Sequence, residues 1–222
     1  LQIIDFSYLP DSTSLVYDSD QLINTMHNIF IDTLHRKLYT TGGPVYDLTD
    51  PVNPIFLFDM GFSCHDMYIE DNIGYFNRGT AGMYVYDLTN NTPQNMGFID
   101  TYPYQGYNHS GWLSYNDSIY VFADETHGTH LKVADVSNYN NITVLSTLTS
   151  GTAPNAIPHN LIIKDDYLYI SYYHDGLQIF DISDPYNPIK VGYYDTYSPN
   201  NHNGYAGAWG VYPLLPSGII LV

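Results

Sequence analysis

Four histidines precede similar apolar segments in this sequence, and they are the residues best suited to do chemistry. They are His27, His65, His109 and His159. Successive members lie 38, 44 and 50 residues apart, and each stands before a short run of alternating apolar residues. Two more histidines, His127 and His174, lie in polar segments beside carboxylates. This spacing predicts that a repeated structural unit brings imidazoles and carboxylates to one place.

Imidazole nitrogens and carboxylate oxygens together form a suitable coordination shell for zinc, iron or manganese. The candidate metal ligands are His65, His109, Asp124, Glu125, His127, His159 and His174. The sequence contains no HExxH motif, so the hypothesis depends on convergence in space. A divalent metal, either a transition metal or calcium, is therefore one hypothesis for the cofactor. The alternative is structural, with the histidines hydrogen-bonded to the backbone of a neighbouring repeat.

Aromatic side chains offer a second kind of site. Trp112 and Trp209 head equivalent segments of two repeats. Together with Tyr107 and His109 they are the candidate ligand-binding residues. Exposed Trp and Tyr rings present flat, amphipathic surfaces that suit recognition of a glycan or a protein. The alternative for both tryptophans is packing in the core between repeats.

The elements that must position these residues are short strands in a repeat of 40–50 residues. One phrase, an apolar strand ending in Asp, occurs at residues 1–5, 43–47, 83–87, 131–135 and 177–181. A turn follows each copy, often with Pro, which cannot donate to a strand ladder. The His-headed segment and a Tyr-containing apolar run precede the last four copies. Four strands per period predict the antiparallel blades of an all-β propeller.

The order of strands in a blade predicts where the candidate residues lie. We expect the first strand to run along the central channel from an upper face, so that the His-headed ends surround the upper mouth. The turn between the second and third strands returns to this face. It carries Asp124, Glu125 and His127 in one repeat and His174 in another. The Asp-containing turns belong to the opposite face, where we expect a structural capping role.

The chain contains four complete blades and two half blades in a single domain over residues 1–222. Residues 1–20 supply the last two strands of a blade, and residues 208–222 supply the first two. Because the chain begins and ends in strand-like runs, we expect a piece of a longer protein, incomplete at both ends. Two interpretations follow. The chain is part of a larger ring of seven blades, or its two halves join to close a five-bladed ring.

The charge of the chain limits its partners. Six Lys and Arg against 23 Asp and Glu give a net charge of −17. Such an acidic chain repels phosphate backbones, which argues against a nucleic-acid partner. No apolar run approaches the ~18 residues of a membrane span. The single cysteine, Cys64, excludes an internal disulfide.

The repeat phrases resemble those of the choice-of-anchor B family, bacterial β-propellers with LVIVD-type repeats. The matching stretches are residues 63–66, 107–112, 124–128, 158–160, 171–177 and 207–213. The resemblance implies an exported protein of the bacterial cell surface, with further blades upstream and a short continuation downstream. It therefore favours the larger ring. The resemblance does not settle whether the protein is an enzyme.

Three functions remain open on the sequence. The leading hypothesis is a non-enzymatic, exported surface propeller that binds a protein or glycan partner through its His-, Tyr- and Asn-rich upper face. The second is a metal-dependent enzyme, a hydrolase or lyase, that uses the upper-face histidines. The third is a structural subunit of a cell-envelope assembly.

Overall fold

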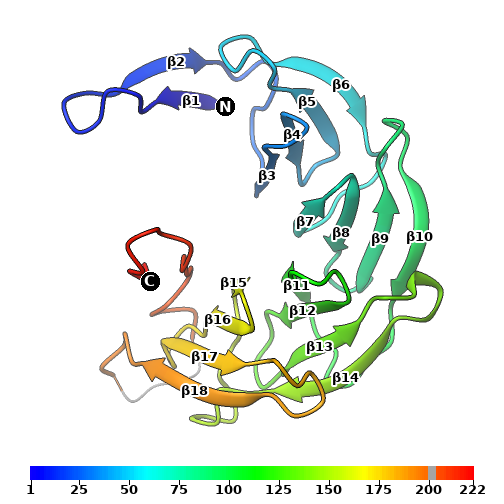
Figure 1. The fold of residues 1–222 in the computed structure, drawn as a ribbon, viewed down its shortest axis with the longest axis vertical. Coiled ribbons are helices and arrows are strands. Elements are labelled where there is room, and N and C mark those ends of the chain that lie inside the picture. The colour runs from blue at the N-terminus through cyan, green and yellow to red at the C-terminus, as the bar shows by residue number, and fades with distance from the viewer. Residues whose placement is uncertain (200–203) are drawn as a thin grey trace.

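The protein is built from antiparallel sheets that follow one another around a central opening (Figure 1). The computed structural model describes residues 1–199 and 204–222. Four sheets have four strands each, with the strands paired in sequence order. Tyr139–Asn141 forms a short 3-10 turn, and no helix among the described residues is long and apolar enough to cross a membrane. The all-β propeller architecture predicted from the repeats is confirmed.

Each four-stranded sheet is one blade, with its first strand innermost in the arc (Figure 1). Blade 1 comprises β3 (Ile29–Asp32), β4 (Lys37–Thr40), β5 (Pro44–Asp47) and β6 (Ile55–Asp59). Blade 2 comprises β7 (Asp66–Glu70), β8 (Ile73–Asn77), β9 (Met83–Asp87) and β10 (Gln94–Ile99). Blade 3 comprises β11 (Asn108–Leu113), β12 (Ile119–Asp124), β13 (Leu131–Asp135) and β14 (Thr143–Leu148). Blade 4 comprises β15 (Leu161–Lys164), β16 (Tyr167–Ser171), β17 (Leu177–Asp181) and β18 (Ile189–Tyr194).

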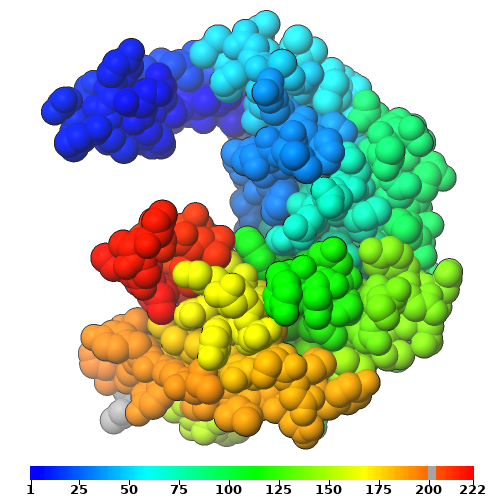
Figure 2. Space-filling model, in the orientation of Figure 1, coloured from blue at the N-terminus to red at the C-terminus, as the bar shows by residue number. Residues whose placement is uncertain are grey.

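The two half blades lie at the two ends of the arc. β1 (Gln2–Asp5) and β2 (Ser14–Asp18) form a two-stranded sheet of their own. The predicted strands of residues 208–222 are reduced to isolated bridges, Ala208 with Tyr173 and Tyr212 with Leu221. Figure 2 shows open space between the two ends. The two halves share no sheet among the described residues, and the number of blades in the ring stays a prediction.

The apolar core lies between neighbouring blades. Alternation along each strand places apolar side chains on both faces of a sheet, and each face packs on the next blade. Tyr39 of blade 1 and Phe76 of blade 2 belong to one such cluster. Another joins blades 2 and 3, and a third joins blades 3 and 4. Burying one large apolar side chain in this way stabilises the fold by about 1.5–3 kcal/mol.

The repeated aspartates cap the turns that follow the third strand of each blade. Asp47 accepts a hydrogen bond from the backbone N–H of Thr49 at 2.6 Å, and Asp87 accepts one from Thr89 at 2.8 Å. Asp135 and Asp181 accept in the same way from the residue two positions on, at 2.9 Å. The side-chain hydroxyl and then the backbone N–H of that residue, Thr89 for Asp87 and Ser183 for Asp181, lower the pKa of the aspartate, because both hydrogen bonds favour the ionised carboxylate. The predicted capping role is confirmed.

Replacing Phe76 with alanine tests the packing between blades. Phe76 has no exposed surface, so we expect Phe76→Ala to lower the free energy of unfolding by about 3–5 kcal/mol. Phe98, on the outer strand of the same blade, is 50% exposed. We expect Phe98→Ala to change stability by less than about 0.5 kcal/mol. Urea denaturation followed by tryptophan fluorescence measures both, and equal effects would contradict the assigned core.

Candidate functional site

The four histidines that head the blades form a continuous row of rings. We call His27, His65, His109 and His159 the histidine row. The ring centroids of successive members lie 4.1, 4.2 and 4.2 Å apart. Each blade contributes one member, so the row follows the inner ends of the blades along the curve of the arc.

Backbone pairing inside each blade fixes the position of these histidines. The N–H of His65 donates to the carbonyl of Asn77 at the end of β8, at 2.7 Å. The N–H of His159 donates in the same way to Ser171 at the end of β16, at 3.0 Å. His109 lies within β11 itself. Since equivalent ends of the inner strands converge toward the centre of the arc, their side chains reach from one blade to the next.

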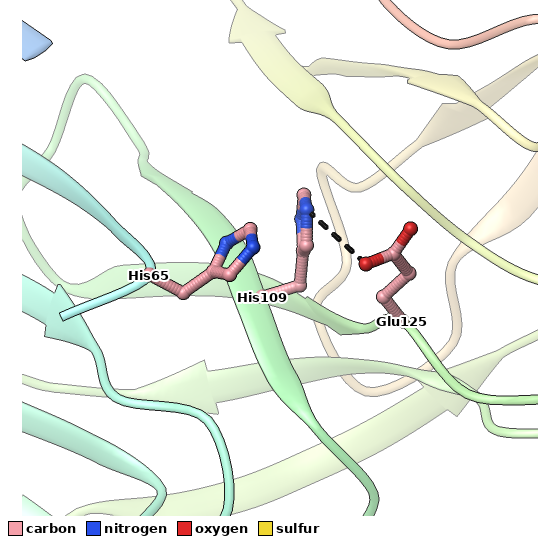
Figure 3. Close-up of side chains that lie close together, drawn as sticks. All are labelled: His65, His109 and Glu125. Atoms are coloured by element: carbon pink, nitrogen blue, oxygen red, sulfur yellow. Dashed lines mark ion pairs between the residues drawn. The ribbon is translucent and has the colours of Figure 1, made fainter. Parts of the chain in front are cut away.

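Glu125 brings a carboxylate to the middle of the row. It follows β12 directly, in the turn predicted to share a face with the strand heads. Its Oε2 atom lies 3.6 Å from Nε2 of His109, and its Oε1 atom lies 3.6 Å from Nε2 of His159. Figure 3 shows the carboxylate facing the His109 ring, with His65 on the other side of that ring. His65, His109 and Glu125 each present a ligand atom within 4.8 Å of the others.

Burial keeps three members of the row, His65, His109 and His159, uncharged. Desolvation, followed by the neighbouring imidazoles of His159, His65 and His27, lowers the pKa of His109 to about 2. Desolvation also lowers the pKa of His65 and of His159, although the carbonyl of Trp209 and the Glu125 carboxylate partly offset it at His159. These three imidazoles are therefore neutral at pH 7 and keep a lone pair for a hydrogen bond or a metal.

The hydrogen bonds of the row identify the protonated nitrogen of His159. Its Nδ1 atom lies 2.5 Å from the backbone carbonyl oxygen of Trp209. A carbonyl oxygen only accepts, so Nδ1 carries the hydrogen and Nε2 carries the lone pair that faces Glu125. The hydroxyl of Tyr173 donates to Oε1 of Glu125 at 2.5 Å. In His109, Nδ1 is buried and has no hydrogen-bond partner among the described residues.

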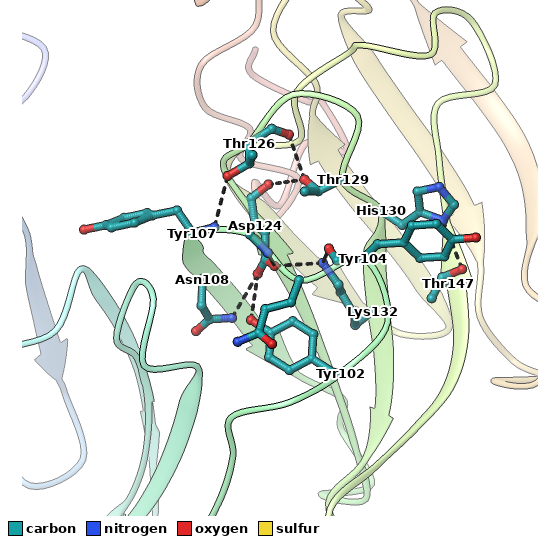
Figure 4. Close-up of polar contacts among 12 residues, drawn as sticks. Tyr102, Tyr104, Tyr107, Asn108, Asp124, Thr126, Thr129, His130, Lys132 and Thr147 are labelled. Atoms are coloured by element: carbon teal, nitrogen blue, oxygen red, sulfur yellow. Dashed lines mark hydrogen bonds and ion pairs between the residues drawn. The ribbon is translucent and has the colours of Figure 1, made fainter.

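Asp124, another candidate ligand, belongs to a different network. It is completely buried and forms an ion pair with the equally buried ammonium of Lys132 at 2.9 Å. Its carboxylate also accepts from the hydroxyl of Tyr102 at 3.1 Å, the amide of Asn108 at 3.3 Å and the N–H of Gly106 at 2.5 Å (Figure 4). Both oxygens are thus engaged, so Asp124 holds the turn next to Glu125 in place and does not reach the histidine row.

The remaining candidate histidines lie against other rings. The His174 ring stacks on Tyr197 with centroids 4.1 Å apart, and the His127 ring meets the edge of Tyr205 at 5.7 Å. Among the described residues, neither belongs to the group of ligand atoms around His65, His109 and Glu125. The structure therefore separates His127 and His174 from the centre of the row. Residues 200–203, in the Asn-rich segment that follows Tyr197, lie outside the described residues.

Two of the aromatic candidates flank the row, and one does not. The Tyr107 ring stands edge-on to His65 at 5.3 Å and is 40% exposed. The Trp209 ring lies 5.1 Å from that of His159 and is 63% exposed. Trp112 lies three residues beyond His109 along β11 and packs on Tyr68 at 4.8 Å. The predicted binding face thus contains Tyr107, His109 and Trp209, whereas Trp112 lines the channel.

Sequence reasoning missed two residues that shape this region. Tyr173 orients Glu125, but it occurs in one blade, so the repeat pattern gives no signal for it. Asp66 follows His65 directly and lines a channel cavity of about 230 Å³ with Asn28, Ser110 and Asn160. Asn28 donates to its carboxylate at 2.9 Å, and burial raises the pKa of Asp66 to about 7. Asn28, Asp66, Ser110 and Asn160 each follow a row histidine directly in the sequence, and this shared position was the signal that could have identified the cavity.

The comparisons with known proteins agree with this architecture. The LVIVD repeat matches residues 158–196, which include all four strands of blade 4. The chain is a β-propeller repeat protein with an LVIVD repeat. A search of curated proteins found no similar sequence.

Solved propellers of low sequence identity share the fold. A Pseudomonas aeruginosa periplasmic gluconolactonase matches with a TM-score of 0.63 and 12% identity, over 86% of this chain and 60% of that one. The WD40 propeller domain of Doa1 matches with a TM-score of 0.62 and 13% identity, over 94% of this chain and 64% of that one. A putative 6-phosphogluconolactonase from Bacteroides uniformis matches with a TM-score of 0.59 and 16% identity, over 85% of this chain and 60% of that one. The chain thus spans about three fifths of the length of these structures.

The Asp124–Lys132 pair should be essential for stability. Lys132→Met leaves the buried Asp124 carboxylate without its counter-charge, so we expect a loss of about 3–5 kcal/mol in the free energy of unfolding. Lys37→Met removes a cation from the surface of blade 1 and should cost less than about 0.5 kcal/mol. Urea denaturation compares the two. A Lys132→Met protein as stable as Lys37→Met would show that the pair does not hold the turn.

Proposed function

We propose that this chain is the propeller of an exported bacterial cell-surface protein of the choice-of-anchor B type. We further propose that it acts as a binding module. The LVIVD repeat in blade 4 and the related phrases in the other blades support this placement. The net charge of −17 also fits a protein that stays away from anionic lipid and nucleic acid.

The observation that carries the proposal is the unbroken row of rings on one face. The row crosses four blades and is continued by Trp209 beyond His159. Tyr107 and Trp209 expose much of their ring surface beside it. Because the exposed rings of Tyr107, beside His65, and Trp209, beside His159, lie along the row, an extended partner can touch several blades at once. A glycan chain or an extended protein segment fits such a surface, since both stack on aromatic side chains.

Removing the exposed rings should weaken binding. We expect Trp209→Ala or Tyr107→Ala to lower affinity for the partner by roughly tenfold or more, the effect of losing a hot-spot aromatic residue. Tyr115→Ala is the matched control, because Tyr115 is 74% exposed and lies in the turn between β11 and β12, away from the row. A glycan array tests carbohydrate partners, and affinity capture from envelope extracts tests proteins.

The two assays separate the classes of partner. Saturable binding on the array identifies a glycan, and capture that survives glycosidase treatment identifies a protein. An equal loss of binding in Trp209→Ala and Tyr115→Ala would contradict the assigned face. Absence of binding in both assays would contradict the module itself.

A metal-dependent hydrolase or lyase is the second candidate function, favoured by the carboxylate between two neutral imidazoles. Two propellers of similar fold are described as a gluconolactonase and a putative 6-phosphogluconolactonase, so lactones are the first substrates to test. If the chain is such an enzyme, wild type hydrolyses gluconolactone with added Zn²⁺, and His109→Gln lowers kcat/KM by roughly 100-fold or more. A pH-stat assay measures both. Hydrolysis at the uncatalysed rate would remove this candidate.

A further inference from the structure

We propose that the centre of the histidine row binds one divalent transition-metal ion. Its ligands are Nε2 of His109, the carboxylate of Glu125 and a ring nitrogen of His65, which lie within 4.8 Å of one another. Nε2 of His159 faces the other oxygen of the same carboxylate and joins them after a small shift. The site lies on the proposed binding face and deepens that function by naming a cation as a ligand of the face. Metal and partner can be measured separately, so either proposal can fail alone.

The nitrogen–oxygen distances at the centre of the row are close to the distance between two ligand atoms bound to one ion. Each Nε2 atom of His109 and His159 lies 3.6 Å from an oxygen of Glu125. That is too long for a hydrogen bond, which needs about 2.7–3.2 Å between nitrogen and oxygen. Two ligand atoms on a tetrahedral ion at ~2.0–2.2 Å lie ~3.4 Å apart. Small shifts of the side chains therefore place an ion between the rings and the carboxylate.

The protonation of His159 leaves two lone pairs facing each other. Nδ1 donates its hydrogen to the Trp209 carbonyl, so Nε2 points a lone pair at Glu125. The oxygen that it faces already accepts a hydrogen bond from Tyr173. Two acceptors at this separation repel unless a positive charge lies between them. A metal cation supplies this charge and gains a bond from each atom.

Burial makes this arrangement costly without an ion. His159 and His109 are each 3% exposed, and their tilted rings lie 4.2 Å apart. A polar nitrogen that is removed from water and faces another acceptor is unfavourable. A metal ion satisfies it, because neutral imidazole and ionised carboxylate are the forms that coordinate a metal.

Groups behind two of the ligands, His159 and Glu125, hold them as metal sites require. Metal-binding histidines donate their other N–H to a carbonyl or carboxylate, as His159 does to Trp209. Ligating carboxylates are themselves hydrogen-bonded, as Glu125 is by Tyr173. The Asp124–Lys132 pair fixes the strand end that precedes Glu125. The site is therefore organised before the ion arrives.

The chemistry of the ligands selects the class of ion. Two or three imidazole nitrogens with one carboxylate suit Zn²⁺, Fe²⁺ or Mn²⁺. Ca²⁺ and Mg²⁺ require shells of oxygen atoms, and only Glu125 supplies oxygen here. The net charge of −17 raises the local concentration of any cation near the chain.

Zinc binding to the chelator-stripped full chain tests the proposal. Isothermal titration with ZnCl₂ should give one ion per chain with Kd tighter than ~1 μM, and elemental analysis after dialysis should find the same stoichiometry. Co²⁺ in place of Zn²⁺ should give visible bands of a low-symmetry nitrogen and oxygen site. Excess Ca²⁺ or Mg²⁺ should leave the titration unchanged.

Three variants and a matched control locate the ion. We expect His109→Gln and Glu125→Gln to weaken Zn²⁺ binding by more than roughly 100-fold, and Tyr173→Phe by roughly 10–100-fold because it only orients Glu125. His130→Gln is the control, since His130 lies in the same blade but stacks on Tyr104 at 3.6 Å, away from the row. It should bind Zn²⁺ as wild type does. The midpoint of urea denaturation establishes that each variant is folded. We expect Glu125→Gln to fold, because it keeps the size of a partly exposed side chain.

The proposal is overturned if the stripped wild-type chain takes up no Zn²⁺. It is also overturned if His109→Gln, Glu125→Gln and His130→Gln bind alike, which would indicate surface binding only. Repeating the partner assay in chelator separates the two proposals. Partner binding without any metal uptake refutes the metal site alone, and metal uptake without any partner refutes the binding module alone.

Discussion

Both faces of each complete blade carry apolar side chains, and the burial of one blade against the next is the constraint on which the rest of the structure depends. Tyr39 and Phe76 illustrate it, since they come from different blades and share one buried cluster. This packing fixes the distance and angle between neighbouring sheets. Once these are fixed, equivalent positions at the inner strand ends must lie side by side, whatever residues occupy them.

The packing between blades aligns the histidine row, and the same packing makes the polar rings costly to bury. The packing that brings His109 and His159 to 4.2 Å also removes water from them and lowers the pKa of both. The result is that the rings of His109 and His159 are neutral and carry lone pairs beside the Glu125 carboxylate. A purely structural role would need each lone pair to meet a donor. At His159 the lone pair meets another acceptor, which is why a cation is the natural occupant.

Asp124 and Glu125 are adjacent in sequence and have opposite roles. Asp124 ends β12 and points into the blade, where Lys132 and three further donors use its oxygens. Glu125 is the first residue beyond the strand and reaches across to His109 and His159. Because side chains alternate between the two faces of a strand, a shift of one position separates a structural ion pair from a candidate ligand.

The sequence by itself determined the period, the four complete blades, the aspartate caps and the face on which the row histidines and Glu125 meet, because all of these repeat with the strands. It did not distinguish Asp124 from Glu125, or His159 from His174, since all four are of residue types that bind metals. Tertiary structure decided between them through contacts that occur once, such as those of Lys132 and Tyr173. A repeat fixes where equivalent residues lie, whereas unique side-chain partners fix which of them remain available to a ligand.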